Sequence, residues 1–334
     1  MPGGHWRPTR QSGVVLLSVL LILALLSAIT YQMVGRQSLV VAQARQTFSG
    51  DQALEYALGG EAFARQILYE DWSQTGQGVD NLTEAWAQPL APFEVEDGFL
   101  EIQIRDLNGC FNLNSVALNS GGSGTLGLER FRTLLRHLNL PDTIADAWID
   151  WIDPDEEISA YGAEDGEYLL RERPYRTANR SAGHVSELAL LRDMEAEQLE
   201  QLSSAVCVIP SDRLQLNINT ASAIALAALH PALSEVQMLA ITEGVRTYTS
   251  VNEITSQQVE LQGAVDALSV TSEYFEVQIR AQVGESITEL ASVLRRAPED
   301  GVITLLSRDF GRSFRSLFSA DDVEGDGAAQ EAGT

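Results

Sequence analysis

The sequence predicts an α+β protein with three parts: a long N-terminal transmembrane and stem helix, an αβ domain with an antiparallel sheet, and a large inserted α-helical domain. A long uncharged apolar run follows a short basic leader, which indicates the first helix. Strand-like alternation appears both before residue 110 and after residue 265, while the segment between them has mainly helical character. We therefore expect one sheet fed from both ends of the chain, with the helical domain inserted at 110–265.

The apolar run VVLLSVLLILALLSAIT, residues 14–30, is long enough to cross a bilayer, since no charge occurs between Arg10 and Arg36. The leader, residues 1–13, carries two arginines and no acid, which predicts that it stays cytoplasmic while the remainder is exported. A secretory signal is cut after its apolar run, whereas the cleavage-like residue here, Gly13, precedes the run. Cleavage at Gly13 would leave a mature protein that begins with its own membrane helix.

The helical spacing of apolar residues continues beyond the membrane, so we predict one helix over 14–70 that is apolar at first and amphipathic afterwards. Gly59 and Gly60 are a weak point that would allow close packing rather than end the helix. The alternative is a plain membrane anchor followed by a separate short helix.

Strands are predicted at both ends of the folded part. PFEVEDGFLEIQIRDLNG, residues 92–109, has nearly alternating apolar residues across an Asp-Gly turn. SEYFEVQIRAQVG, residues 272–284, has the same character, and the pattern continues through ITELASVLRR and GVITLLSRDFG. We therefore assign 71–109 and 266–319 to the αβ domain.

The charge balance limits the possible partners. The chain has 47 acidic residues against 22 basic ones, all of them arginine, and a net charge of −25. Phosphate contacts need a cationic surface, so this balance argues against nucleic acid as a partner. It suits an exported soluble domain. The acidic end of the chain, residues 320–334, is predicted to be disordered.

The acidic segment DWIDPDEEISAYGAEDGEY, residues 150–168, is the strongest candidate site. So many carboxylates on one loop repel each other unless they are solvated, spread apart or neutralised, and Ca²⁺ takes six to eight oxygen ligands. Pro154 would stiffen the turn, and Gly162 would let the chain double back to bring carboxylates together. The expected ligands are Asp153, Asp155, Glu164 and Asp165. The alternatives are a solvated acidic loop and a carboxylate pair for glycoside hydrolysis in a membrane-anchored hydrolase.

A second motif resembles a helix-hairpin-helix. NLN (112–114) and NIN (217–219) each open an Asn-capped helix, and the second leads into LNINTASAIALAALHPALSEVQMLAITEGVR. Helix-hairpin-helix modules bind the DNA backbone through a glycine-rich hairpin, but this hairpin reads HPALS and its surroundings are acidic. A hairpin that packs against protein is therefore favoured. The alternative interpretation of this motif is a membrane-anchored, competence-type DNA-binding protein.

The chain has two cysteines, Cys110 and Cys207. In an exported domain such a pair is typical of one disulfide, whereas two buried thiols would be expected in the cytosol. The predicted export favours the disulfide.

Taken together, several blocks resemble the K-type minor pseudopilin family of the type II secretion system. They extend over residues 11–312 and comprise the leader ending in Gly13, DLNGCFNLN, DWIDPDEE, GAEDGEY, PYRTANRSAGHVSELALLRDM and LNINTAS. The resemblance implies a structural protein rather than an enzyme. It would lie at the tip of a periplasmic pseudopilus with the I-type and J-type minor pseudopilins, anchored by a single pass in the bacterial inner membrane and working with the inner-membrane secretion platform.

The resemblance also implies processing and a metal. Prepilin peptidase would cut after Gly13 and Val14 would be N-methylated, and calcium would bind in the acidic loop at the four carboxylates named above. Most pseudopilins have Glu as the fifth mature residue, where it pairs with the N-terminal amine of a neighbouring subunit; here that residue is Ser18. An uncharged Ser18 avoids burying a carboxylate in lipid but cannot pair with a subunit above it, which fits a tip position.

Overall fold

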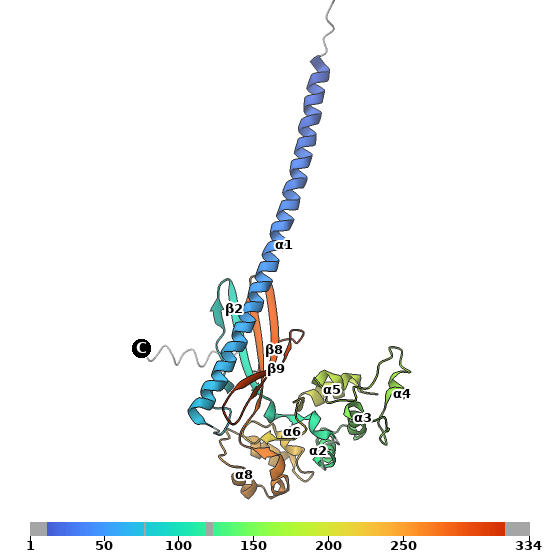
Figure 1. Cartoon of the computed structure of the whole chain (residues 1–334), viewed down its shortest axis with the longest axis vertical. Coiled ribbons are helices and arrows are strands. Elements are labelled where there is room, and N and C mark those ends of the chain that lie inside the picture. The colour runs from blue at the N-terminus through green and yellow to red at the C-terminus, as the bar shows by residue number, and fades with distance from the viewer. Residues whose placement is uncertain (1–11, 77, 118–122, 318–334) are drawn as a thin grey trace, which may run out of the picture.

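The structure, a computed structural model, describes residues 12–76, 78–117 and 123–317. Its first element is α1 (Ser12–Thr75), a single helix of 64 residues that projects from the folded body as a rod (Figure 1). The helix continues without interruption through Gly59 and Gly60. The predicted acidic tail and most of the leader lie outside the described residues.

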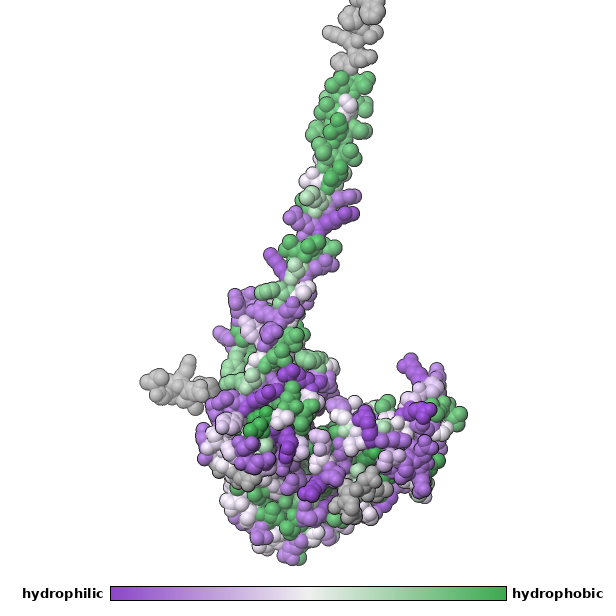
Figure 2. Space-filling model, in the orientation of Figure 1, coloured by the Kyte–Doolittle hydropathy of each residue, from purple (hydrophilic) through white to green (hydrophobic). Residues whose placement is uncertain are grey.

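The two halves of α1 have different surroundings. Its N-terminal end is an exposed and mainly apolar surface (Figure 2), and among the described helices α1 is the one long and apolar enough to cross a membrane. Its C-terminal half packs on the sheet through buried small and aliphatic side chains. A Cβ atom at Gly60 would lie 3.3 Å from side-chain atoms of both Ile102 and Ile279, so a glycine here allows the helix to approach the sheet closely.

The sheet has five strands in the order β1-β2-β7-β8-β9, and every neighbouring pair is antiparallel. The strands are β1 (Phe93–Val95), β2 (Gly98–Asp106), β7 (Tyr274–Val283), β8 (Ser286–Arg296) and β9 (Ile303–Asp309). β2 and β7 pair along their whole length although the inserted domain separates them in sequence. The α+β fold class, with one sheet fed from both ends of the chain, is therefore confirmed.

The inserted domain consists mainly of short helices and two-residue bridges. In chain order it contains the 3₁₀ helices and strands η2 (Leu107–Gly109), β3 (Phe111–Asn112) and η3 (Leu113–Val116), then α2 (Ser123–His137), α3 (Thr143–Ile152), α4 (Asp165–Tyr168), η4 (Val185–Leu190), α5 (Ala196–Ser203), β4 (Val206–Cys207), β5 (Leu216–Asn217), α6 (Ala223–Ala227), α7 (Glu235–Thr242), α8 (Val251–Gln257), η5 (Val259–Ala267) and β6 (Leu268–Ser269). One more 3₁₀ turn, η1 (Ala85–Ala87), precedes the sheet.

Within the segment of predicted helical character, residues 123–152 form two helices, α2 and α3, rather than one. The chain turns between them at Asn139, whose φ is 56°, and Pro141 follows two residues later. Asparagine tolerates this left-handed conformation better than most residues, and proline cannot continue a helix. The division brings α2 and α3 side by side instead of in line.

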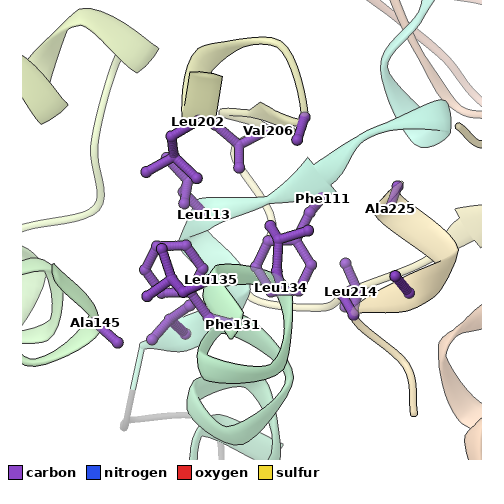
Figure 3. Close-up of a cluster of buried hydrophobic side chains, with 14 of the residues drawn as sticks. Phe111, Leu113, Phe131, Leu134, Leu135, Ala145, Leu202, Val206, Leu214 and Ala225 are labelled. Atoms are coloured by element: carbon purple, nitrogen blue, oxygen red, sulfur yellow. The ribbon is translucent and has the colours of Figure 1, made fainter. Parts of the chain in front are cut away.

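The core of the inserted domain forms around α2. Phe111 and Phe131 stack with their ring centroids 5.7 Å apart, and Leu134 and Leu202 point into the same cluster (Figure 3). Trp148 is completely buried there, and its indole N–H donates to the Leu113 carbonyl at 3.0 Å. Large buried side chains from distant segments thus give this domain a hydrophobic core of its own.

A buried polar network joins the inserted domain to the sheet. Asp106, at the end of β2, accepts hydrogen bonds from the hydroxyls of Ser272 at 2.6 Å and Thr220 at 2.5 Å and from the Asn108 amide at 2.7 Å. Burial raises the pKa of Asp106 to about 6, and these hydrogen bonds act in the opposite direction. The joint between the two parts therefore includes a carboxylate that titrates above its usual range.

Candidate metal centre

The acidic segment lies at the outer end of the inserted domain, between α3 and α4 (Figure 1). Asp150 belongs to the last turn of α3, and Asp153 caps it, its amide donating to the Ile149 carbonyl at 2.9 Å. Pro154 follows and stops the helix. Glu164 then immediately precedes α4, so the chain returns toward the end of α3.

Three carboxylates of this segment are buried. Asp150, Asp153 and Glu164 are 0%, 5% and 3% exposed. Both oxygens of Asp150 accept from the Ser159 amide, at 3.2 and 3.1 Å, and Oε2 of Glu164 accepts from the Thr177 hydroxyl at 3.1 Å. Among the described residues, however, Asp153 Oδ1 and Glu164 Oε1 are buried without a hydrogen-bond partner. Leaving a buried charged oxygen unpaired is costly, so each of these two atoms could accept a proton or bind a cation.

The pKa values of these three carboxylates are all raised by burial. The pKa of Asp153 is raised to about 7, first by burial and then by repulsion from Asp155, Asp150 and Glu164. Burial likewise raises the pKa of Glu164 to about 6, against the effect of its hydrogen bond from Thr177. The pKa of Asp150 is raised as well, first by burial. A divalent cation with oxygen ligands would neutralise this repulsion, and the donor set therefore fits calcium.

The structure arranges the four predicted ligands unequally. Asp153 and Glu164 lie at the buried centre. Asp155 is exposed and accepts from the Glu157 amide at 2.8 Å. Asp165 is half-buried and is already engaged, by the Arg176 guanidinium at 2.8 Å and the Thr177 amide at 3.0 Å.

Asp150 is at the centre of this cluster, although the sequence did not single it out as a ligand. A Cβ atom at Gly162 would lie 1.8 Å from Asp150 Oδ2, so the glycine lets the returning chain pass directly over this carboxylate. Gly162 thus packs against Asp150, whereas the sequence indicated only that it allowed the chain to turn. The signal that could have identified Asp150 is a carboxylate in the otherwise apolar helix sequence AWIDWI.

A second group of carboxylates lies beside the sheet. Among the described residues, Asp71, Asp80 and Glu84 are the group whose ligand oxygens all lie within 4.8 Å of one another. The buried guanidinium of Arg296 pairs with Asp71 at 2.8 Å and with Asp80. This group therefore already contains a cation from the protein itself, unlike the acidic segment.

The remaining predicted residues lie on α1 and at the base of the inserted domain. Gly13 and Val14 are in the first turn of α1, and the Ser18 hydroxyl donates to the Val15 carbonyl at 2.8 Å. Cys110 and Cys207 are joined by a disulfide, with their Cα atoms 5.8 Å apart.

The segment that resembles a helix-hairpin-helix forms two short helices, α6 and α7, which contact each other across the HPALS turn. Ser234 caps α7 and accepts from the Gln237 amide at 3.2 Å.

Comparisons with known proteins agree with this architecture. A family model described as type II secretion system (T2SS), protein K, matches residues 109–211. Type II secretion system protein K of Pseudomonas aeruginosa is 35% identical over 315 residues, which cover 90% of this chain and 93% of that protein. The same protein of Aeromonas hydrophila is 34% identical, covering 89% and 96%. A chain of the GspK-GspI-GspJ complex of the enterotoxigenic Escherichia coli type 2 secretion system is 28% identical with a TM-score of 0.66, covering 81% of this chain and all of that one.

Proposed function

The chain belongs to the type II secretion system protein K family, and from this premise we propose that it forms the tip of a periplasmic pseudopilus and helps initiate or cap its assembly. The family is one of structural minor pseudopilins in a protein secretion system. The observation that carries the proposal is α1: one continuous helix with an exposed apolar first half and a second half that packs on the sheet. Such a helix can leave a membrane as the stem of a fibre subunit without losing its connection to the folded domain.

The proposed location is the inner membrane, with the folded part in the periplasm. The disulfide between Cys110 and Cys207 supports an oxidising compartment. The basic leader supports an orientation with its residues on the cytoplasmic side.

The proposed partners are the I-type and J-type minor pseudopilins. Support comes from the E. coli complex, in which a chain of similar fold is solved together with GspI and GspJ. Prepilin peptidase would cleave after Gly13 and expose Val14, and the inner-membrane platform would receive the mature chain. Ser18, which carries no charge, supports a position with no subunit above it.

We further propose that the acidic segment holds calcium. Asp153 and Glu164 would supply the two unpaired buried oxygens, Asp150 would complete the buried part of the site, and Asp155 and Asp165 would close it from the exposed side. The ion would neutralise the clustered carboxylates and tie α3 to the segment before α4. Its role would be structural, because these residues connect two parts of one domain.

N-terminal sequencing combined with co-purification tests the proposal. In cells that contain prepilin peptidase and the I and J subunits, the mature chain should begin at Val14 and co-purify with both subunits. Gly13→Val should block cleavage and reduce co-purification at least tenfold, whereas Gly35→Ala, in an exposed part of the same helix, should change neither. An N-terminus beyond Thr30, or equal recovery of both subunits with the uncleaved chain, would contradict it.

A further inference from the structure

The helix α7 has apolar side chains on two opposite sides, yet only one of these sides is buried. Met238 and Ile241 point into the core, whereas Val236 is 77% exposed and Leu239 is 58% exposed on the opposite side. Val245, just after the helix, is 73% exposed. Large apolar side chains that are exposed together on one face indicate a contact surface, and this face of α7 has no partner within the described part of the chain. We call Val236, Leu239, Ala240 and Val245 the α7 face.

The border of the α7 face is acidic. Glu243 is exposed at the C-terminal end of the helix, and Glu260 lies along its flank, where it accepts from the Gln237 amide group at 3.1 Å. The nearest arginine in the sequence, Arg246, is directed inward: its guanidinium donates to the Ile218 carbonyl at 2.7 Å. The face is therefore an apolar strip beside carboxylates, with its neighbouring cation engaged elsewhere.

The position of this module excludes the membrane that holds α1. The part of the inserted domain with α6 and α8 lies at the end of the molecule opposite the start of α1 (Figure 1). α7 packs on α6 and therefore belongs to that end. A subunit anchored through α1 would present the α7 face away from its own bilayer.

Charge argues against covering of the α7 face by the acidic end of this chain or by a second copy of the chain. Residues 320–334 contain five acids and no base, so they would be repelled by the border of the face. A second copy docking through the same face would bring its own Glu243 and Glu260 to the border and no free cation, because Arg246 is engaged in each copy. The remaining occupant is a different protein whose surface is apolar and positively charged.

We propose that the α7 face is a docking surface for an amphipathic helix of another protein, with lysine or arginine residues beside its apolar stripe. Leu239 and Val236 would pack between its apolar side chains, and Glu243 and Glu260 would pair with its flanking cations. This assigns the helix-hairpin-helix-like module a role in protein binding, since its acidic border and its hairpin without glycine both oppose phosphate.

Site-specific cross-linking to a defined peptide tests this proposal. The full chain would carry the photoreactive residue p-benzoylphenylalanine in place of Val245, or of Ile287 as a control at an exposed apolar position on the sheet, in phosphatidylcholine nanodiscs. The probe is an 18-residue helical peptide with a leucine stripe flanked by lysines; the control peptide has glutamate at every lysine position. We expect the adduct from position 245 with the lysine peptide to exceed both controls at least tenfold.

Variants in the face provide the second arm of the test. Val236→Ser with Leu239→Ser should lower the adduct at position 245 at least fivefold, and Glu243→Lys should lower it at least threefold. Val302→Ser, at another exposed position, should have no effect. Unchanged thermal unfolding of each variant would show that its fold is intact. Equal adducts from positions 245 and 287, equal adducts with the two peptides, or full binding by a folded double variant would overturn the proposal.

Discussion

At the scale of single residues, the acidic segment is defined by what its carboxylates lack. Asp150 accepts two hydrogen bonds, but one oxygen each of Asp153 and Glu164 is buried without a partner. The Asp71 and Asp80 carboxylates, in contrast, pair with Arg296. This difference, rather than the number of acids, makes the first group a metal-site candidate and the second a structural ion-pair network.

Asp153→Asn should distinguish the binding of calcium by this side chain from its repulsion of the neighbouring carboxylates. In 1 mM calcium chloride we expect the variant to melt about 5 °C below the wild type. Bound calcium stabilises the folded state, and a variant that no longer binds calcium loses this stabilisation. In chelator we expect no loss, because the repulsion around Asp153 is relieved. Glu156→Gln, on the exposed part of the same loop, should behave like the wild type in both conditions. Equal destabilisation of Asp153→Asn with and without calcium would argue against a metal site.

Ser18 allows a test of the tip position by one substitution. Ser18→Glu should reduce the amount of the chain recovered with the I and J subunits, because a carboxylate without a subunit above it must be buried unpaired in lipid. At the centre of a membrane helix such a charge costs about 2.5–3.5 kcal/mol, and at Ser18, nearer the end of the apolar run, this value is the upper bound. Ser18→Ala, which removes only the hydrogen bond to the Val15 carbonyl, is the matched control. If the glutamate variant assembles as well as the alanine variant, the tip argument from Ser18 fails.

At the scale of elements, the two Asn-x-Asn motifs serve as equivalent anchors. Asn112 is the second residue of β3, where it pairs with Cys207 of β4, and Asn217 is the second residue of β5, where it pairs with Ser269 of β6. The amide of Asn114 binds the Ala182 and Ile209 carbonyls, while that of Asn219 binds Asp80 and Tyr248 carbonyls. Each motif thus satisfies backbone groups of remote loops, which explains why a domain of short helices can hold a fixed shape.

The disulfide links Cys110, the residue before β3, covalently to Cys207 of β4. It closes a loop with a sequence separation of 97 residues and lies where β3 and β4 pair. Replacing both Cys110 and Cys207 by serine should lower the free energy of unfolding by about 2–5 kcal/mol, because the unfolded chain gains the freedom that the bridge removes. Denaturant titration of both proteins measures this. A wild type that loses no stability on reduction would contradict it.

At the scale of the whole molecule, the sheet and the inserted domain depend on a shared polar joint around Asp106. Its pKa is raised from 3.8 to about 6 in the folded protein, so the folded state binds its proton more tightly than the unfolded chain does. The contribution is therefore most favourable below about pH 4 and is lost as the pH rises through about 6. A difference of about two pKa units at 1.36 kcal/mol each corresponds to about 3 kcal/mol.

Asp106→Asn should accordingly flatten the pH dependence of stability. Between pH 4 and pH 7.5, in chelator, the free energy of unfolding should fall by about 2.5 kcal/mol less in Asp106→Asn than in the wild type. Denaturant titrations at several pH values measure the two profiles. Glu96→Gln, at an exposed position, should follow the wild type. Parallel profiles for wild type and Asp106→Asn would show that this carboxylate does not control the joint.

The sequence by itself determined the features that depend on local pattern. Hydropathy and the absence of charge defined the first half of α1, period-two alternation indicated β2 and β7, and the density of acids located the segment between α3 and α4. The break at Asn139 was not anticipated, because the apolar pattern on both sides of it is helical.

Only the tertiary structure decided which side chains are buried together. It brought Asp150 to the centre of the acidic segment, supplied Arg296 to the carboxylates beside the sheet, and left one face of α7 exposed. A carboxylate has the same local sequence signal whether water, an arginine or no group lies opposite it. Its burial and partners are set by residues far away in the chain, and for that physical reason the fold was needed to distinguish them.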